Sequence, residues 1–517
     1  MKWNVPDFGV RGQTTLERIV MKKIIALILI LLLVLSGCGS QATISGAPDC
    51  QHTDRDDNGL CDLCHRSVLV TIDFYAINDL HGKLADGDSH PGVDELTTYL
   101  KNARRSENVV LLSVGDMWQG SAESNLTQGN IITDWMNELD FAAMTLGNHE
   151  YDWGEMAIEA NAAIAHFPFL AINIYDRATN TRVDYCDASV VVELCGLQIG
   201  IIGAMGDCYN SIASDKTEDI YFKTGDALTA LVKAESERLR REKGVDFIVY
   251  AIHDGWDTSG TGHLYADDLA SYYDPSLSNG YVDLVFEGHT HQKYMAPDDY
   301  GVYHLQHKGD NTGGISHVEI RINSLTGSYT VVEAALISKG TYAALEDDPI
   351  VEDLLYKYKD QISDADRVVG VNSAYRSSDA LCDLVAELYY ELGLANWGET
   401  YDIALGGGFL SARSPYSLDA GEVTYGDLQS LFPFDNDIVL CAVSGRDLLD
   451  RFIETDNYRY HVFGNWGQIE PNGTYYIVVD TYTAYYAPNH LTVVEAYTPG
   501  IYARDLLADY IHAGGLE

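Results

Sequence analysis

Residues 147–154 read Gly-Asn-His-Glu-Tyr-Asp-Trp-Gly, and this polar stretch follows directly on the apolar run Ala142–Leu146. A short apolar run that ends abruptly in polar residues and glycine is typical of a buried β-strand leading into a loop. Asn, His, Glu and Asp offer donor atoms and proton carriers rather than apolar surface. We therefore expect a strand over 142–146 with chemically active side chains after its carboxyl end.

The same pattern occurs four more times between residues 68 and 291. Each time an apolar run leads into a polar cluster: Val68–Ile77 into Asn78-Asp79-Leu80-His81-Gly82, Val109–Val114 into Gly115-Asp116, Val245–Ile252 into His253-Asp254, and Val282–Phe286 into Glu287-Gly288-His289-Thr290-His291. Helix-compatible stretches such as 93–105 and 227–243 separate these units. Alternating strands and helices predict a layered α/β domain.

Polar clusters that follow the strands of an α/β sheet collect where the carboxyl ends of the strands meet. A single histidine after a strand is usually a loop or capping residue, but five clusters in succession are hard to explain in that way. Hard divalent ions favour carboxylate and amide oxygens, and borderline ions also accept imidazole. We therefore expect a metal site built from Asp79, His81, Asp116, Asn148, His253, His289 and His291.

In this order, the motifs Asp-x-His, Gly-Asp, Gly-Asn-His-Glu, His and Gly-His-x-His resemble those of the calcineurin-like metallophosphoesterases. Residues 77–82 and 147–154 resemble, more narrowly, the 5′-nucleotidase and UDP-sugar hydrolase family. The resemblance covers roughly residues 69–335 and implies two divalent metal ions. It places Asp79, His81 and His291 on one ion, Asn148, His253 and His289 on the other, and Asp116 between them.

The resemblance also implies that His149, oriented by Asp152, faces the phosphate rather than a metal and stabilises the transition state or protonates the leaving oxygen. A pair of divalent ions roughly 3.5–4 Å apart polarises phosphoryl oxygens and lowers the pKa of a shared water for in-line attack. The sequence contains neither a Gly-x-Ser-x-Gly elbow nor a Walker loop that would suggest another mechanism. The donors do not distinguish Zn, Mn, Fe and Co.

Residues 406–449 resemble the C-terminal, substrate-specificity domain of the same nucleotidase family, with a similarity that extends over roughly 369–511. In that family the domain supplies an aromatic clamp for the base and arginines near the site, which implies substrate contacts for Phe434, Asn436 and Arg413. Phe434 lies in a polar turn context that presents an aromatic side chain, whereas Phe432 is expected in the core.

Two departures from the family leave the substrate open. The usual Asn-x-Gly-x-Arg lacks its arginine here, and the next one is Arg413; the usual Gly-Gly-Asp-Gly segment with the second clamp aromatic is replaced by residues 480–488, where Tyr485 or Tyr486 could serve. The leading hypothesis is hydrolysis of 5′-nucleotides. The alternatives are a phosphomonoesterase or phosphodiesterase for cyclic nucleotides, nucleotide sugars or another organic phosphate, and a non-catalytic surface binding protein, against which the His149–Asp152 pair argues.

These patterns predict an α/β protein of two folded domains. A layered metallophosphoesterase β-sandwich flanked by helices is expected over 68–336, a linker with an amphipathic helix over 337–366, and an α+β C-terminal domain over 367–517. The 33 Lys and Arg against 77 Asp and Glu give a formal charge of -44, which repels nucleic acids and anionic membranes. We therefore expect no nucleic-acid partner, and positive charge at a phosphate site that comes from metal ions.

The amino-terminal residues resemble a bacterial export leader. Lys22 and Lys23 precede an apolar run over 24–35 that ends in Leu-Ser-Gly-Cys, so residues 21–38 are expected to be a lipoprotein signal peptide with Cys38 as the lipidated residue. Residues 1–20 resemble no leader and are expected to be a spurious extension. The expected location is the outer face of the bacterial cell membrane, with the lipid as the only membrane contact.

The segment 39–67 contains a second group of metal-ligand residues. Cys50, His52, Cys61 and Cys64 have the composition of a small tetrahedral zinc site. The acidic residues from Asp54 to Asp62 also follow the start of a calcium loop, although His65 stands where such a loop ends in glutamate. Zinc, calcium and a redox-labile spacer that binds no metal all remain open at this point. The other cysteines, Cys186, Cys195, Cys208, Cys382 and Cys441, lie in apolar contexts and are expected to be buried thiols.

Overall fold

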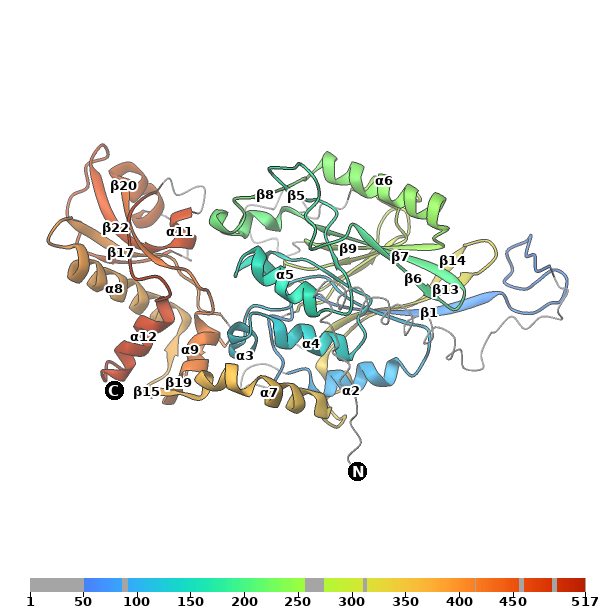
Figure 1. Cartoon of the computed structure of the whole chain (residues 1–517), viewed down its shortest axis with the longest axis horizontal. Helices are drawn as coiled ribbons and strands as arrows, with labels where there is room; N and C mark the ends of the chain where they lie inside the picture. Colours follow the sequence, from blue (N-terminus) through green and yellow to red (C-terminus); the bar gives the residue numbers. More distant parts are fainter. Residues whose placement is uncertain are drawn as a thin grey trace, which may run out of the picture.

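The computed structural model describes residues 51–85, 92–255, 274–309, 314–413, 415–454, 460–485 and 491–516. Two bodies lie side by side along the long axis of the molecule (Figure 1), and each has hydrophobic clusters of its own. The expected two-domain α/β fold is confirmed. The leader, Cys38 and Cys50 lie outside the described residues. No helix in the described ranges has both the length and the apolar character that a membrane span needs.

Two six-stranded sheets form the centre of the first domain. One contains, in spatial order, β14 (Tyr329–Ile337), β13 (Ile315–Asn323), β1 (Leu69–Ile77), β2 (Val109–Ser113), β3 (Ala143–Thr145) and β4 (Phe169–Leu170). The other contains β11 (Tyr294–Pro297), β12 (Tyr303–Gln306), β10 (Leu284–Glu287), β9 (Phe247–His253), β7 (Leu197–Met205) and β6 (Ser189–Leu194). The inner faces of the two sheets share one hydrophobic cluster, in which the Phe74 and Phe247 rings stack with centroids 5.5 Å apart.

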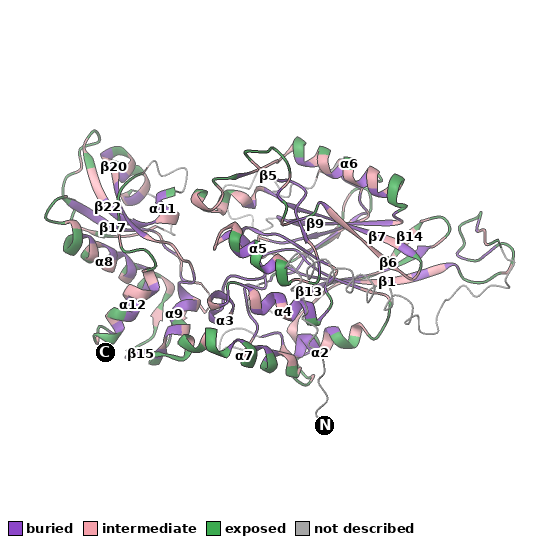
Figure 2. Cartoon of the chain, in the orientation of Figure 1, coloured by how far each residue is buried: buried purple, intermediate pink, exposed green. Residues whose placement is uncertain are grey.

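Helices cover the outer faces of this sandwich. The helix α6 (Asp226–Lys243) packs on the second sheet through Leu228, Val232 and Leu239. On the first sheet lie α2 (Asp94–Ala103), α4 (Asn130–Glu138) and α5 (Glu155–Ile164). Figure 2 shows buried strands between helices whose outer faces are exposed. The central strands β2, β9 and β10 read as nearly continuous apolar runs because both of their faces are covered.

The stretch expected as a linker with an amphipathic helix contains α7 (Pro349–Ile362). Asp348 caps this helix by accepting a hydrogen bond from Ile350 N, and Pro349 occupies the first helical turn. Val351, Leu354 and Tyr358 of α7 belong to the hydrophobic cluster beneath α4. The helix therefore packs as part of the first domain rather than as a free connection.

The second domain is built on a five-stranded sheet. Its order is β21 (Tyr460–Gly464), β17 (Ile403–Phe409), β22 (Thr474–Asp480), β20 (Ile438–Ser444) and β23 (Thr492–Ala496). The helices α8 (Ser378–Trp397), α9 (Tyr425–Leu431) and α12 (Ala503–His512) share one core cluster with the sheet. The helix α9 contacts α3 (Ala122–Leu126) of the first domain, where Asn125 Nδ2 donates to Gln429 O over 3.5 Å.

Candidate active site

The predicted metal donors converge at the carboxyl ends of parallel strands from both sheets. β1, β2 and β3 are parallel neighbours in the first sheet, and β9 and β10 are parallel neighbours in the second. Three groups have all their ligand atoms within 4.8 Å of one another: Asp79 with His81 and His291, Asp79 with Asp116 and His253, and Cys208 with His253 and His289. The structure thus brings together side chains that lie up to 212 residues apart in the chain, as from Asp79 to His291.

The backbone at this edge of the sheets is held in an unusual conformation. Five of the donor residues have a positive φ between 51° and 72°: Asp79, His81, Asp116, His289 and His291. A left-handed backbone is unfavourable for side chains with a Cβ, and it persists only where surrounding contacts enforce it. Gly147 lies so close to Asp116 Oδ1 that an added Cβ would clash with the carboxylate. The sharp turns at these residues therefore direct the donor side chains toward one another.

Backbone carbonyls set the orientation of two of the imidazoles. His81 Nδ1 donates to Gln119 O over 2.9 Å, and His253 Nδ1 donates to Val114 O over 2.6 Å. Each bond places the proton on Nδ1 and leaves Nε2 directed at the site as an acceptor. His81 Nε2 lies 3.1 Å from His291 Nε2, which in turn lies 3.3 Å from Asp79 Oδ1. Two imidazole nitrogens facing each other beside a carboxylate are arranged as ligands of a shared cation.

Asp116 and Asn148 complete the donor set. Asp116 Oδ2 lies 3.1 Å from His253 Nε2, and its Oδ1 accepts a hydrogen bond from His149 N over 2.9 Å. Asn148 Oδ1 is buried and has no hydrogen-bond partner among the described residues. A buried amide oxygen without a partner is costly unless a cation takes its lone pair. The carboxylate, amide and imidazole donors therefore fit divalent metal ions of the borderline class.

The electrostatics of the site favour the protonation states that metals require at His81, His289 and Asp116. Burial, reinforced by the neighbouring charges of His291 and His149, lowers the pKa of His81 to about 3. Burial also lowers the pKa of His289 to about 4. For Asp116, burial acts to raise the pKa, but the charges of His253 and His149 outweigh it and hold the carboxylate pKa well below its usual value. At neutral pH these groups are neutral imidazoles and an ionised carboxylate, which are the ligand forms. At His253, burial acts to lower the pKa, but the negative charge of Asp116 outweighs it and raises the pKa to about 10.

His149 and Asp152 form a pair beside the metal donors. His149 Nδ1 donates to Asp152 Oδ2 over 2.8 Å, and both side chains are largely buried. Burial acts to lower the His149 pKa, but the negative charges of Asp152 and Asp116 outweigh it, so the pKa is raised. The His149 ring lies 5.2 Å from the His81 ring. An imidazole fixed through Nδ1 can present its other nitrogen to a reacting oxygen.

Comparison with known proteins agrees with this geometry. Residues 72–293 match the calcineurin-like phosphoesterases, and residues 361–464 match the 5′-nucleotidase C-terminal domain. The chain belongs to the 5′-nucleotidase-like metallophosphoesterases. It is 26% identical over 469 residues to the apyrase of Tabanus yao, covering 84% of this chain and 79% of that protein. It is 24% identical over 480 residues to the 5′-nucleotidase of Vibrio vulnificus, covering 84% and 81%.

The fold is shared with a solved structure, the 5′-nucleotidase precursor of Thermus thermophilus. The TM-score is 0.64 at 21% identity, and the match covers 86% of this chain and 96% of that one. This metallophosphoesterase therefore has the two-domain architecture of 5′-nucleotidases, and its enzyme class is that of a metal-dependent phosphoric ester hydrolase.

The second domain of this metallophosphoesterase brings Phe434, one of the predicted substrate residues, onto His149, and a second, Arg413, lies beside Phe434. The Phe434 ring stacks on the His149 ring with centroids 5.8 Å apart and an angle of 26° between the planes. The Arg413 guanidinium lies 5.6 Å from the centre of the Phe434 ring. Phe432, by contrast, is buried in the core, as expected. Because Phe434 stacks on His149, a change at Phe434 can also affect the chemistry of the first domain.

The other predicted substrate residues are less well placed. Asn436 is partly exposed two residues after Phe434. Tyr485 is 40% exposed, its carbonyl oxygen accepts a hydrogen bond from Ser214 of the first domain, and its ring makes no contact with Phe434 in the described part of the chain. Tyr486 lies outside the described residues. The two aromatic rings therefore do not form a closed sandwich in this arrangement.

Two further buried groups near the metal donors were missed in the sequence. Glu150, fully buried, accepts hydrogen bonds from Gly147 N at 2.7 Å and Asp116 N at 2.9 Å with one oxygen, and from Met117 N at 2.8 Å with the other. Burial and then the Asp116 charge raise its pKa to about 7. The only sequence signal was its place next to His149. Cys208 is a buried thiol, as expected, but it lies beside His253 and His289, and burial raises its pKa well above the usual value.

A third missed residue, Arg504 of α12, holds the segment that carries Phe434. Arg504 is 4% exposed, and its guanidinium donates to Phe432 O at 3.3 Å and Phe434 O at 3.1 Å and pairs with Asp435. Its Nε also lies 3.3 Å from the Tyr425 hydroxyl. Some 70 residues separate Arg504 from this segment in the chain, so no local pattern could have connected them.

Proposed function

We propose that this metallophosphoesterase hydrolyses 5′-nucleotides to nucleoside and phosphate. The observation that carries the proposal is the contact between its two domains: Phe434 of the C-terminal domain stacks on His149 of the catalytic domain, and the Arg413 guanidinium lies 5.6 Å from the centre of the Phe434 ring. An aromatic ring and a guanidinium beside the phosphate site suit a substrate that has both a flat base and negative charge. Relatives named as 5′-nucleotidase and apyrase support the same substrate class.

The donor set divides into two metal positions in this proposal. Asp79, His81 and His291 would hold one ion, Asn148, His253 and His289 the other, and Asp116 would contact both. Two divalent ions bound there would polarise the phosphoryl oxygens and activate water for attack on phosphorus. The donors accommodate zinc, manganese, iron or cobalt.

The residues of the chain supply proton transfer and orientation. His149 is fixed by Asp152 through Nδ1, so its Nε2 is the atom that can protonate the leaving ester oxygen. The raised pKa keeps a larger fraction of His149 protonated near neutral pH. Asp152 is a positioning residue, because it acts on the substrate through His149.

A second candidate function, hydrolysis of a phosphate ester without a nucleobase, is favoured by one observation. The Phe434 ring occupies the face of His149, and Tyr485 makes no ring contact with it in the described residues. A nucleobase sandwich therefore requires a rearrangement that a small ester does not need. The relative rates on the two substrate classes distinguish the two functions.

The test is phosphate release from 5′-nucleotides, cyclic nucleotides, nucleotide sugars and p-nitrophenyl phosphate, with and without added divalent metals. We expect metal-dependent release that is fastest on a 5′-nucleotide, and a fall of about 10²–10⁴-fold in His149→Ala with the metal content unchanged. A faster reaction on the baseless ester would favour the second candidate, and loss of a metal from His149→Ala would make His149 a ligand.

The base contact is tested separately by Phe434→Ala. Stacking on an aromatic ring contributes about 1–3 kcal/mol per base, so we expect kcat/KM on AMP to fall roughly 5- to 150-fold. The fall in kcat/KM on p-nitrophenyl phosphate should be smaller, because for an ester without a base the variant removes only the packing of Phe434 on His149. Equal losses on both substrates would mean that Phe434 serves His149 rather than a base.

We also propose that the enzyme acts outside the cytoplasm as a lipoprotein. The proposal rests on the leader-like residues 21–38 and on Cys38 in the Leu-Ser-Gly-Cys sequence. Cys38→Ala should release the protein from the membrane fraction, whereas the wild type should remain there and be accessible to protease on intact cells. An intracellular, protease-protected wild type would contradict export.

A further inference from the structure

Residues 51–67 form a compact segment ahead of β1, at the end of the first domain farthest from the C-terminal domain (Figure 1). Backbone hydrogen bonds close it into turns: Asp62 N donates to Thr53 O over 2.7 Å, and His65 N donates to Cys61 O over 2.8 Å. The strand β1 runs from this segment to the active site over nine residues, or about 30 Å. The segment is therefore remote from the catalytic donors.

Apolar burial cannot account for the order of this segment. Its two leucines, Leu60 and Leu63, are 44% and 64% exposed. Cys61, in contrast, is fully buried. A stretch of 17 residues without an apolar core lacks the burial that folding requires, and small segments of this kind are usually held by disulfides or metals.

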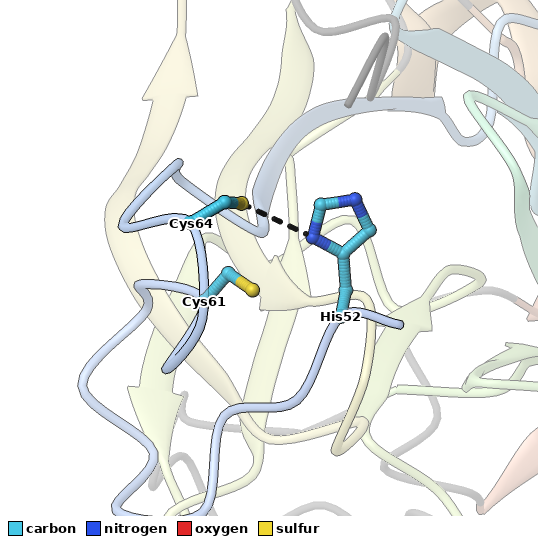
Figure 3. A group of neighbouring side chains, drawn as sticks. All are labelled: His52, Cys61 and Cys64. Carbon is cyan, nitrogen blue, oxygen red and sulfur yellow. Dashed lines mark hydrogen bonds between the residues drawn. The ribbon is translucent and has the colours of Figure 1, made fainter. Parts of the chain in front are cut away.

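Three side chains of the segment form a group with the composition of a zinc site. His52, Cys61 and Cys64 point toward one another (Figure 3), and their ligand atoms all lie within 4.8 Å. Cys61 and Cys64 flank a tight turn, the spacing that lets two sulfurs reach one ion. Cys64 Sγ lies 3.4 Å from His52 Nδ1. Zn–S and Zn–N bonds of about 2.3 and 2.1 Å at a tetrahedral angle separate the two ligand atoms by about 3.6 Å.

We propose that His52, Cys61 and Cys64 hold a structural zinc ion that is distinct from the catalytic metals. Thiolate sulfur and imidazole nitrogen together select zinc over the harder calcium and magnesium ions. Cys50 was the fourth predicted ligand and lies outside the described residues; the three described donors carry the proposal. The ion cross-links the two ends of the segment, and its binding free energy stabilises the fold that apolar burial cannot.

Asp54, Asp56 and Asp62 also have ligand atoms within 4.8 Å of one another, but the hydrogen bonds of Asp54 and Asp57 show that these two carboxylates are engaged within the protein. Asp54 accepts hydrogen bonds from Asn58 N at 3.1 Å, Gly59 N at 2.8 Å and Asn323 Nδ2 at 2.7 Å. Asp57 accepts from the side chains of Asn323, Thr326 and Ser328 at 2.6–2.8 Å. These carboxylates fasten the segment to the turn between β13 and β14. The zinc ion thus orders the segment, and the carboxylates dock it on the first domain.

The experiment measures the metal content of the full-length chain by mass spectrometry after dialysis against a weak chelator. We expect Cys61→Ser/Cys64→Ser to contain one zinc equivalent fewer than the wild type and to hydrolyse phosphate esters at the wild-type rate. Limited proteolysis should then cut within 51–67 at least about 10-fold faster. Cys195→Ser, a cysteine outside both metal groups, is the matched control and should match the wild type in zinc content and protease resistance.

A second measurement on the wild type does not depend on the folding of the variant. Alkylation of Cys61 and Cys64, followed by peptide mass spectrometry, should be slow with zinc bound and fast after a zinc-selective chelator. The proposal is overturned by an unchanged zinc content in the double variant, by a disulfide between the two cysteines in the wild type, or by protection with calcium but not zinc. Loss of hydrolysis in the double variant, with the catalytic metals still bound, would also overturn the claim that the zinc site is independent of the active site.

Discussion

At the scale of single residues, Asp116 joins the two halves of the metal donor set. One oxygen lies beside His253 Nε2, and the other accepts from the backbone of His149. Asp116→Asn keeps the shape but removes the charge, so we expect turnover to fall roughly 10²-fold or more with a weakened affinity for one metal. Turnover, metal content and thermal unfolding of the variant, measured together, test this prediction. A variant with two bound metals and near-normal turnover would contradict the shared position of Asp116.

Glu150 is the buried acceptor on which the neighbouring loops depend. Glu150→Ala leaves the amides of Gly147, Asp116 and Met117 without their acceptor, which should lower the free energy of unfolding by at least about 2 kcal/mol. Metal affinity should fall about 10- to 100-fold because Asp116 and Asn148 lie on those loops. Denaturant unfolding and metal titration measure the two effects. Glu159→Ala, on the exposed face of α5, should change neither; equal effects in both variants would remove Glu150 from this role.

At the scale of elements, α12 positions the Phe434 segment through Arg504. Arg504→Met removes the donors to the carbonyls of Phe432 and Phe434 and the partner of Asp435. We expect kcat/KM on AMP to fall about 10-fold more than on p-nitrophenyl phosphate, with Arg504→Lys failing to restore it because a lysine cannot reproduce the planar set of bonds. Arg451→Met, at a more exposed ion pair in the same domain, is the control. Equal losses on both substrates would indicate a general loss of folding.

The strand ends of the first domain could be predicted because each polar cluster follows an apolar run at once, so local pattern and tertiary position coincide. The seven predicted metal donors follow strands in this way, whereas the pairing of His149 with Asp152 was expected from the resemblance to the nucleotidase family. The antiparallel addition of β13 and β14 to one edge of the first sheet was not predictable, because pairing partners are set by long-range packing. Arg504 and Cys208 were missed for the same reason: their partners are distant in sequence.

At the scale of the whole molecule, the two domains have separate hydrophobic cores. The proposed catalytic metals bind only the first domain, so removing them should destabilise that domain alone. We expect differential scanning calorimetry to resolve two transitions, one of which falls when a chelator is added and recovers with zinc or manganese. If both transitions moved together, the domains would unfold as one cooperative unit.

The second domain has a pH-sensitive element of its own in Asp480 at the end of β22. Burial raises the Asp480 pKa to about 6 from 3.8 in the unfolded chain. Folding therefore favours the protonated form of Asp480. The stability that the folded domain loses through ionisation of this carboxylate is zero below pH 3.8, grows between pH 3.8 and about 6, and is complete above about pH 6. The difference of about two pH units corresponds to about 3 kcal/mol. Asp480→Asn, whose amide oxygen can still accept from Thr483 N, should raise the second transition at about pH 7.5 but not near pH 4.

A rise that is equal at both pH values would show that the gain in Asp480→Asn does not come from the carboxylate charge. Asp509→Asn, a surface change on α12, serves as the control for a general effect of net charge and should leave the transition unchanged at both pH values.

The left-handed backbone at the metal donors has a consequence for how such a sequence persists through evolution. Each non-glycine residue in that conformation costs of order 1–3 kcal/mol, and five of them stand together at one edge of the sandwich. Glycine, which lacks a Cβ, would relieve that strain at every one of these positions. A lineage selected only for heat resistance would therefore drift toward glycine at these positions and lose its chemistry.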